Sequence, residues 1–159
     1  MIRMAQIKDL DDIMEVYAYA RKFMAESGNP TQWGSTYPDR LLIKEDIKNK
    51  RMYVIDEADK VHAVFMFAIG EDETYKIIKN GQWMSDKEYG VIHRVASDGQ
   101  IKGVLNSVVG FCMKRIKHLR IDTHKDNKIM QHQILKNGFK ECGIINLENG
   151  DERIAYEKI

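Results

Sequence analysis

The sequence predicts an α+β fold with a mixed, mostly antiparallel central sheet of about six or seven strands, flanked by about four helices. Two segments near the N-terminus carry apolar residues at helical spacing, and an alternating strand hairpin follows them. The second half of the chain has the pattern of a strand, a helix, a strand, a helix and a terminal hairpin. A chain of 159 residues has the length of one domain, so we expect a single domain over residues 1–159.

The N-terminal part of the chain is expected to give one strand and two helices before the hairpin. Residues 2–5 alternate between apolar and polar side chains, as a short strand does. A group of acidic residues then precedes an apolar stripe, which predicts a helix running to about Glu26. Residues 41–48 show a second, shorter helical pattern. Residues 52–55 and 61–69 are apolar strands separated by a polar turn, which predicts an antiparallel hairpin.

Residues 91–96 are the strand around which we expect the fold to be organised. Their apolar, partly β-branched run suits a strand that is buried at least in part on both faces. Helical spacing resumes close to Gly103, and we expect a basic last turn over residues 114–118, which suits the negative end of a helix dipole. Residues 75–78, which precede the central strand, are ambiguous between a short helix and a strand.

The C-terminal part of the chain contains two further strands, a helix and a hairpin turn. Residues 119–123 alternate as a strand, and a helical pattern follows and ends at Asn137-Gly138, where glycine supplies a left-handed cap. Residues 139–145 are a strand, and Asn149-Gly150 is a pair favoured in tight hairpin turns. We therefore expect residues 144–147 to pair with residues 153–157.

Composition and charge argue against several classes of protein. The chain has 25 Lys and Arg residues against 24 Asp and Glu residues, so its net charge gives no reason to expect nucleic acid or an anionic membrane as a partner. The N-terminus carries charges where a signal peptide needs an apolar core, and no apolar run reaches the length of a membrane span. A cytoplasmic location is therefore expected. Basic residues between 114 and 125 are spread over a helix end, a strand and a loop, which favours a solvated face over a nucleic-acid site.

The cysteines and histidines indicate neither a disulfide framework nor a metal site. Cys112 lies on the apolar face of a predicted helix and Cys142 in a predicted strand, so both are expected to be reduced core residues. The 5 histidines show no ligand spacing supported by cysteines or acidic clusters, so no metal is expected.

The connection between the central strand and the next helix is the strongest candidate for a binding site. A strand that leads into a helix through residues 100–104 directs backbone N–H groups and the positive end of the helix dipole toward the turn. An anion such as a diphosphate fits there. The alternative is an ordinary strand-to-helix turn that contains glycine for steric reasons.

This connection carries a resemblance to a known family. Gln100-x-x-Gly103-x-Leu105 after a strand resembles the (Arg/Gln)-x-x-Gly-x-(Gly/Ala) signature of the GNAT N-acetyltransferase superfamily. In that family the loop cradles the pyrophosphate of acetyl-CoA, which makes acetyl-CoA the implied co-substrate. The resemblance assigns this contact to Gln100, Ile101, Lys102, Gly103 and Val104.

The order of elements over nearly the whole chain also resembles GNAT proteins, which implies a layered α/β/α arrangement. Asn127, followed later by Gly138-Phe139, resembles the Asn of the family's last helix, where N-x-x-A and a later G-F recur; Met130 takes the alanine position. In the family this Asn commonly helps to hold the pantetheine arm. The arm lies beside the central strand, which implies contacts with the backbone of Val95 and Ser97. A helix cap is the alternative role for Asn127, and both roles can hold at once.

The chemistry implied by the resemblance is direct transfer of an acetyl group from acetyl-CoA to a primary amine of a small molecule or peptide. A base must deprotonate the amine, and the candidates are His93 on the central strand and Glu71 at the end of the preceding strand. The alternatives are a satisfied imidazole for His93 and a solvated strand end for Glu71. Candidate acceptor-binding residues are Trp33, Tyr37 and Trp83, although loop aromatics more often tether a loop to the core.

Two positions depart from the family pattern. Leu105 stands where the family usually has Gly or Ala, and Ile134 stands where many members have a tyrosine that protonates the departing thiolate. Tyr17, Tyr37, Tyr89 or a water are the substitutes for that acid. These departures motivate an alternative function, a catalytically silent GNAT-like module that binds acyl-CoA. Many relatives of this fold pair through sheet edges or terminal hairpins, so a homodimer is a candidate assembly.

Overall fold

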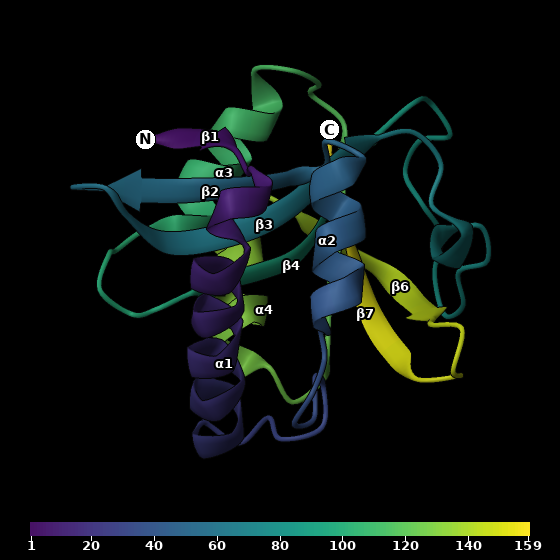
Figure 1. Ribbon diagram of the computed structural model, residues 1–159. Helices are drawn as coiled ribbons and strands as arrows, with labels where there is room; N and C mark the ends of the chain where they lie inside the picture. Colours follow the sequence, from purple (N-terminus) through teal and green to yellow (C-terminus); the bar gives the residue numbers. More distant parts are fainter. The chain divides into compact units, whose positions relative to one another are not determined.

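The computed structural model describes residues 1–159, and its strands form a seven-stranded mixed sheet in the order β1-β2-β3-β4-β5-β7-β6 (Figure 1). The strands are β1 (Ile2–Met4), β2 (Met52–Glu57), β3 (Lys60–Ile69), β4 (Gly90–Ser97), β5 (Leu119–Thr123), β6 (Lys140–Asn146) and β7 (Glu152–Lys158). The α-helices are α1 (Leu10–Glu26), α2 (Arg40–Lys48), α3 (Val104–Met113) and α4 (Lys128–Lys136). The predicted α+β class is confirmed.

Most of the strand pairs are antiparallel, as the sequence predicts. The antiparallel pairs include β1 with β2, β2 with β3, β5 with β7 and β6 with β7. The terminal hairpin forms at the predicted turn, and its register places Ile144 opposite Ile154. β4 and β5 run parallel, with Ile92 opposite Ile121. The sheet is therefore mixed, and β4 is its middle strand.

The chain divides into two compact units. The first consists of residues 1–67 and 93–104, and the second of residues 68–92 and 105–159. β4 contributes residues to both units, because the division falls between Ile92 and His93.

A partly buried group of polar side chains fixes the start of α1 in the first unit. Arg3 donates two hydrogen bonds to the Asp9 carboxylate, at 2.8 and 2.9 Å, and a third to Asp56 at 2.7 Å. Asp9 also accepts the Gln6 N–H at 2.7 Å. The hydrogen bond from Arg3 holds the pKa of Asp9 below its usual range. These bonds connect β1, β2 and the short 3₁₀ turn Ile7–Asp9 that leads into α1.

The hairpin of β2 and β3 is tighter than predicted. Its strands extend to Glu57 and Lys60, which leaves Ala58 and Asp59 as the turn. Both turn residues have positive φ, 51° and 61°, as the two-residue turns that match strand twist require. The polar residues that the sequence suggested as turn are therefore partly strand ends, which propensity does not resolve.

The segment of residues 70–89, between β3 and β4, lies in the second unit and contains little regular structure. A short 3₁₀ helix covers Glu73–Tyr75, and Lys79 forms one antiparallel bridge with Ile144 of β6 through two backbone hydrogen bonds of 2.8 Å. The ambiguous stretch, residues 75–78, thus contains only the last residue of the 3₁₀ helix and is followed by the bridge at Lys79. A Cβ on Gly81 would lie 1.9 Å from a carbonyl oxygen of β6, so this close approach requires glycine.

A buried arginine ties this segment to the strands of the second unit. The Arg120 guanidinium of β5 lies 3.9 Å from the ring centroids of both Trp83 and Tyr89. Its Nη2 donates to the Ser85 carbonyl oxygen at 2.6 Å, and its Nε donates to the fully buried Glu157 carboxylate of β7 at 2.8 Å. Arginine suits this position because its planar guanidinium can stack on rings while it donates to a carboxylate.

The Glu157 carboxylate accepts two further hydrogen bonds. His118 donates from Nε2 at 2.5 Å, and the backbone N–H of Met84 donates at 2.6 Å. A buried carboxylate is tolerated when its charge is paired and its oxygens are hydrogen-bonded, so these groups depend on one another. We call Trp83, Tyr89, His118, Arg120 and Glu157 the Arg120 network.

The helix ends of the second unit follow local signals with one exception. Asn127 caps α4 by accepting a backbone N–H of its first turn at 3.1 Å, and Gly138 follows α4 with a φ of 86°. α3 ends at Met113, so residues 114–118 follow the helix and do not form its last turn, which corrects the prediction. After Met113 the chain leaves the helix through a turn, in which the N–H groups of Arg115 and Ile116 both donate to the Cys112 carbonyl oxygen.

Replacing Arg120 by methionine is expected to lower the free energy of unfolding by about 3 to 5 kcal/mol, because the Glu157 carboxylate then stays buried without its main cationic partner. Urea denaturation followed by circular dichroism measures the loss. Lys114→Met, at an exposed position, is the matched control and should change stability by less than about 0.5 kcal/mol. The double variant R120M/E157Q should regain part of the stability. Equal losses in the single and double variants would contradict the charge-pairing explanation.

Candidate functional site

The middle strand β4 contains a local distortion at Arg94. This residue has a φ of 53°, a conformation that residues other than glycine rarely adopt and that costs roughly 1 to 2 kcal/mol. The Tyr17 hydroxyl of α1 donates to the Arg94 carbonyl oxygen at 2.7 Å, which offsets part of that cost. The distortion therefore lies between His93 and Val95, two of the residues for which the sequence predicts a role at the site.

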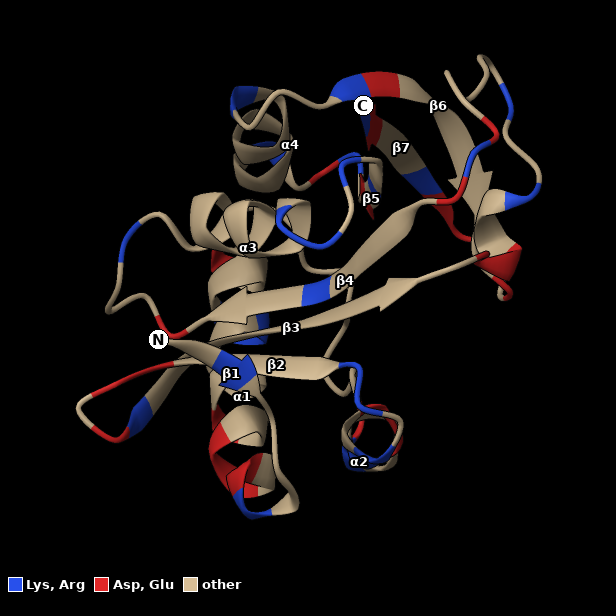
Figure 2. Ribbon diagram, turned by 90° about the horizontal axis from the view of Figure 1, so that it is seen from above, with Lys and Arg blue, Asp and Glu red and all other residues tan.

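The Arg94 side chain connects the distortion to α2. Arg94 is the only Lys or Arg of β4, which carries a blue stretch in Figure 2. Its Nε and Nη2 donate to Asp46 at 3.1 and 2.5 Å, and Asp46 is fully buried. Arg51 adds a longer hydrogen bond to the other Asp46 oxygen, at 3.3 Å. One carboxylate thus pairs with two guanidinium groups, which leaves a net positive charge beside β4.

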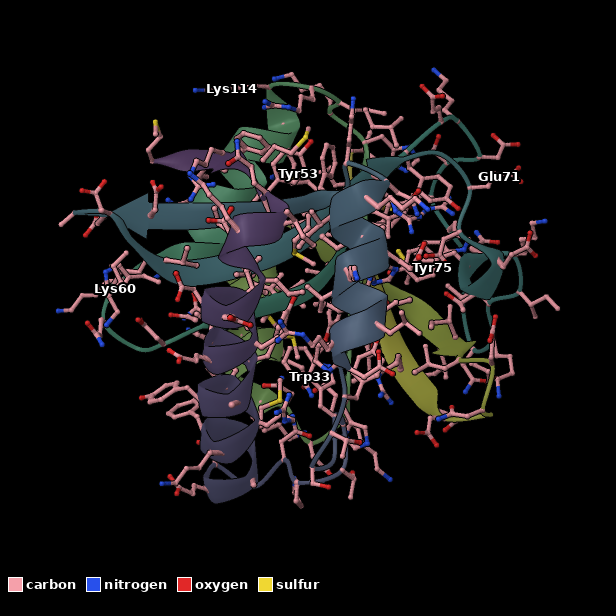
Figure 3. The ribbon with its side chains drawn as sticks, viewed as in Figure 1. Trp33, Tyr53, Lys60, Glu71, Tyr75 and Lys114 are labelled. Atoms are coloured by element: carbon pink, nitrogen blue, oxygen red, sulfur yellow. The ribbon has the colours of Figure 1, made fainter.

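The predicted aromatic residues of the loop between α1 and α2 lie next to this charge. Trp33 contacts the Tyr17 ring edge-on at 5.6 Å, and the Tyr37 ring lies 6.3 Å from Trp33. The Tyr37 hydroxyl accepts a long hydrogen bond from Arg94 Nη1, at 3.4 Å. Figure 3 shows Trp33 between α1 and α2. The structure therefore brings Trp33, Tyr37 and the distorted part of β4 together within the first unit.

Exposure distinguishes the aromatic residues of this group. Trp33 is only 9% exposed, which agrees with the role of an anchor that tethers the loop, whereas Tyr37 is 42% exposed. Tyr17 is fully buried, and burial raises the pKa of its hydroxyl well above the usual range. Tyr17 is therefore a neutral donor whose proton is committed to the Arg94 carbonyl oxygen. Among these rings, Tyr37 is the one that a ligand in solution can reach.

The loop that follows β4 has a defined backbone geometry. Asp98 accepts the Gln100 N–H at 2.9 Å, and the Ser97 hydroxyl accepts the Gly99 N–H at 3.1 Å. The Gln100 N–H is therefore engaged inside the loop, which differs from the expectation that it points outward to a ligand. The N–H groups that begin α3 have no acceptor within the helix, so they are the ones available to an anion.

The space around Gly103 suits close approach of a ligand to the backbone. Gly103 is exposed with a φ of 68°, and a Cβ placed on it would have no atom within 4 Å. α3 begins at the next residue and is 10 residues long, so a full helix dipole points its positive end here, beside the exposed ammonium of Lys102. Leu105 is only 5% exposed, so its side chain is buried and does not fill this space. The donor set fits a diphosphate.

The other predicted cofactor and acid positions lie in the second unit. Asn127 is 9% exposed and caps α4, which is the alternative role that the sequence allowed. Ile134 is fully buried on α4, so the position where many family members have an acidic tyrosine is occupied here by a core residue. Tyr89 is 7% exposed, and its hydroxyl accepts the Asp72 N–H at 2.9 Å. Neither Ile134 nor Tyr89 offers an accessible proton.

The remaining candidates differ in their surroundings. Glu71 lies on the outside of the second unit (Figure 3), 80% exposed and 3.9 Å from the Lys76 ammonium. Trp83 packs on Arg120 and donates from its indole N–H to the Tyr75 carbonyl oxygen at 2.8 Å, so its ring is part of the Arg120 network. His93 is partly exposed on β4. Of the two predicted bases, His93 is therefore the one that adjoins the distorted strand.

Sequence reasoning missed Arg94 and Asp46 as parts of this site, and it considered Tyr17 only as a substitute acid. Asp46 had a detectable signal, because it lies on the buried face of α2 with Ile43 and Ile47, and a buried acid requires a partner. No local signal reveals Arg94, since arginine is not a residue that favours positive φ.

Several kinds of site are not formed in the described residues 1–159. No group of three His, Cys, Asp or Glu side chains is placed to hold a metal ion. Cys112 and Cys142 are both free and buried, and burial raises the pKa of Cys112 to about 12, which makes it a poor nucleophile at neutral pH. None of the helices combines the length and the apolar character that crossing a bilayer demands.

Comparisons with known proteins place this arrangement in one family. No protein-family model matches the sequence, and no curated protein matches it. Among solved structures, a GNAT-family acetyltransferase from Streptococcus agalactiae 2603 is 32% identical, with 100% of this chain and 94% of that chain covered and a TM-score of 0.87. A candidate acetyltransferase from Staphylococcus aureus Mu50 is 26% identical, with 99% and 97% covered and a TM-score of 0.71.

A more distant structure shares the fold alone. It is a GNAT-family acetyltransferase from Listeria monocytogenes 4b F2365, 18% identical, with 99% of this chain and 93% of that chain covered and a TM-score of 0.72. The streptococcal match combines 32% identity with coverage of the complete chain. The chain therefore belongs to the GNAT family and is an acetyltransferase.

Proposed function

We propose that this enzyme transfers the acetyl group of acetyl-CoA to a primary amine of a small molecule or peptide, by direct attack of the amine. The observation that carries the proposal is the loop after β4, where the exposed Gly103 leaves open space at the start of α3. Relatives of similar structure match nearly their full length, which supports one catalytic domain over residues 1–159.

Cofactor contacts follow from the chemistry of the loop and from the family resemblance. The diphosphate would be held by backbone N–H groups of residues 101–104 and by the Lys102 ammonium. Gln100 would contribute through its side chain, because its N–H is bound to Asp98. The resemblance assigns the pantetheine arm to the Val95 and Ser97 backbone and to Asn127. Bound acetyl-CoA supplies the activated acetyl group as a thioester.

His93 is the proposed base. An ammonium group is not a nucleophile, so a proton must leave the acceptor before attack, and imidazole is the side chain best matched to proton transfer near neutral pH. Backbone N–H groups of the distorted β4 strand are suited to donate to the developing oxyanion. Glu71 is the second candidate, but its 80% exposure and its distance of 3.9 Å from the Lys76 ammonium agree with a solvated strand end.

Tyr37 is the proposed wall of the acceptor pocket, with Trp33 behind it as an anchor. Tyr37 combines an exposed ring with a hydroxyl held by Arg94, so it offers both stacking area and a polar group. Trp83 was predicted to share this role, but its ring is engaged with Arg120. We therefore assign Trp83 to holding the 70–89 segment in place.

The first experiment is calorimetric titration of the protein with acetyl-CoA and with CoA, followed by a screen of amines for thiol release. Binding with thiol release in the presence of a particular amine supports the proposal. Binding of acetyl-CoA without thiol release for any amine would favour a silent acyl-CoA-binding module. The buried Ile134, at the position of the family's acidic tyrosine, is the structural reason to consider that alternative. No binding at millimolar acetyl-CoA would contradict the assigned loop.

Gly103→Leu is expected to weaken CoA binding by at least about tenfold, because the side chain occupies the open space and displaces a charge-assisted hydrogen bond to phosphate. Calorimetry measures the dissociation constant. Gly150→Leu is the matched control: Gly150 has a φ of 90°, also has no atom within 4 Å of a Cβ, and lies in the β6 and β7 turn. Equal CoA affinity in both variants would remove the loop from its proposed role.

His93→Gln is expected to lower kcat by at least about 100-fold, because a general base contributes a factor of roughly 10² to 10⁴. The acetyl-CoA dissociation constant should stay within about twofold of the unmodified enzyme, since the imidazole acts on the acceptor and not on the cofactor. Glu71→Gln is the comparison and should leave kcat nearly unchanged. The reverse pattern, with a large loss for E71Q alone, would transfer the role of base to Glu71.

A further inference from the structure

The buried His62 and the half-buried Asp98, at the base of the loop after β4, have no part in the proposed chemistry. His62 lies near the start of β3 and is 8% exposed, and Asp98 is the first residue after β4. Their side chains are 11% and 12% exposed, with His62 Nδ1 2.8 Å from Asp98 Oδ2. An ionised carboxylate only accepts hydrogen bonds, so Nδ1 is the donor.

Asp98 takes part in three hydrogen bonds that together fix the first turn of the loop. One carboxylate oxygen accepts from His62, and the other accepts the Gln100 N–H at 2.9 Å. The Asp98 N–H donates to the His62 carbonyl oxygen at 2.9 Å. His62 thus holds Asp98 through both its side chain and its backbone, and Asp98 in turn sets the direction of the chain at Gln100.

α1 supplies a second restraint on the same turn. A Cβ on Gly99 would lie 2.7 Å from the Tyr19 hydroxyl, so the Tyr19 side chain packs directly against the Gly99 backbone. The Gly99 φ of 78° requires glycine here as well. Two contacts therefore restrain the turn, one from Tyr19 of α1 and one from His62 of β3. The turn precedes the exposed residues that lead to Gly103.

We infer that His62 and Asp98 are positioning residues that set the diphosphate-binding loop before the cofactor arrives. This inference rests on the proposed function of the loop. A loop that is already ordered loses less freedom on binding, so part of the cofactor affinity comes from the restraint and not from direct contact. Without the His62 donor, the Asp98 carboxylate is no longer held in place. The backbone N–H groups after Gln100 are then no longer held pointing toward the diphosphate.

The test compares a cofactor with a diphosphate to one that lacks it. In His62→Ala, the CoA dissociation constant is expected to rise by about tenfold, the usual effect of losing a hydrogen bond to a charged group. kcat/KM for S-acetylpantetheine, which carries no diphosphate, should stay within about twofold, because that substrate does not use the loop. A general loss of structure would weaken CoA binding and also lower kcat/KM for S-acetylpantetheine, so a loss confined to CoA binding is specific to positioning.

A conservative variant and a control complete the series. His62→Asn places an amide nitrogen at the same number of bonds from Cα as Nδ1, so it should restore most of the CoA affinity. His132→Ala removes an exposed histidine of α4 and should leave CoA affinity unchanged. If His62→Ala does not fold, His62→Leu keeps the buried volume without the donor and replaces it in the comparison.

Two failures have distinct readouts. If the unmodified enzyme binds CoA no better than pantetheine, the loop does not hold a diphosphate and the proposed function itself is wrong. If the unmodified enzyme prefers CoA and both His62→Ala and His62→Leu keep that preference in full, the loop holds the diphosphate without His62, and the inference is overturned.

Discussion

The hydrogen-bonded ion pair of Arg94 and Asp46 is the interaction on which the first unit depends. Arg94 holds an unfavourable backbone conformation in the middle strand, and the conformation persists because its side chain and carbonyl oxygen are both bound. Asp46 is fully buried, so its negative charge needs the Arg94 guanidinium as a partner. The conformation of β4 at Arg94 in turn needs Asp46. The same guanidinium orients Tyr37, which connects the backbone of β4 to the exposed ring of the candidate acceptor pocket.

The second unit also contains a long irregular connection that is held by an arginine and a buried acid. Residues 28–39 in the first unit and 70–89 in the second are long connections with little regular structure, which conformational entropy disfavours. Each is held by an arginine on a strand, a fully buried acid and aromatic rings: Arg94 and Asp46 in one unit, Arg120 and Glu157 in the other. Apolar packing alone can hold a loop, but it does not fix the orientation of an aromatic ring. A guanidinium can fix that orientation, because it is planar and its donors point in set directions.

Local sequence patterns predicted most of the helices and strands. The predictions failed where the structure depends on contacts between residues that are distant in the sequence. α1, the strand hairpins and the Asn149-Gly150 turn follow from spacing and turn chemistry that act over a few residues. Residues 75–78 could not be assigned, because they connect a 3₁₀ turn to Lys79, whose bridge partner Ile144 is far away in the sequence. The distortion at Arg94 was equally hidden, since its partners Tyr17 and Asp46 lie 77 and 48 positions away. The loop at Gly103 was identifiable because its signal is contiguous.

The buried Ile134 changes what the chemistry needs from the protein, but it does not disable the reaction. A thiolate is a good leaving group, since ordinary thiols ionise near pH 8.5, so its departure needs little help from an acid near neutral pH. The amine, in contrast, must lose a proton before it can attack. With the Tyr17 proton committed to the Arg94 carbonyl oxygen and Tyr89 only 7% exposed, the thiolate can take its proton from solvent or from the exposed Tyr37. The demanding step therefore falls on the base, for which we propose His93, next to the distorted residue of β4.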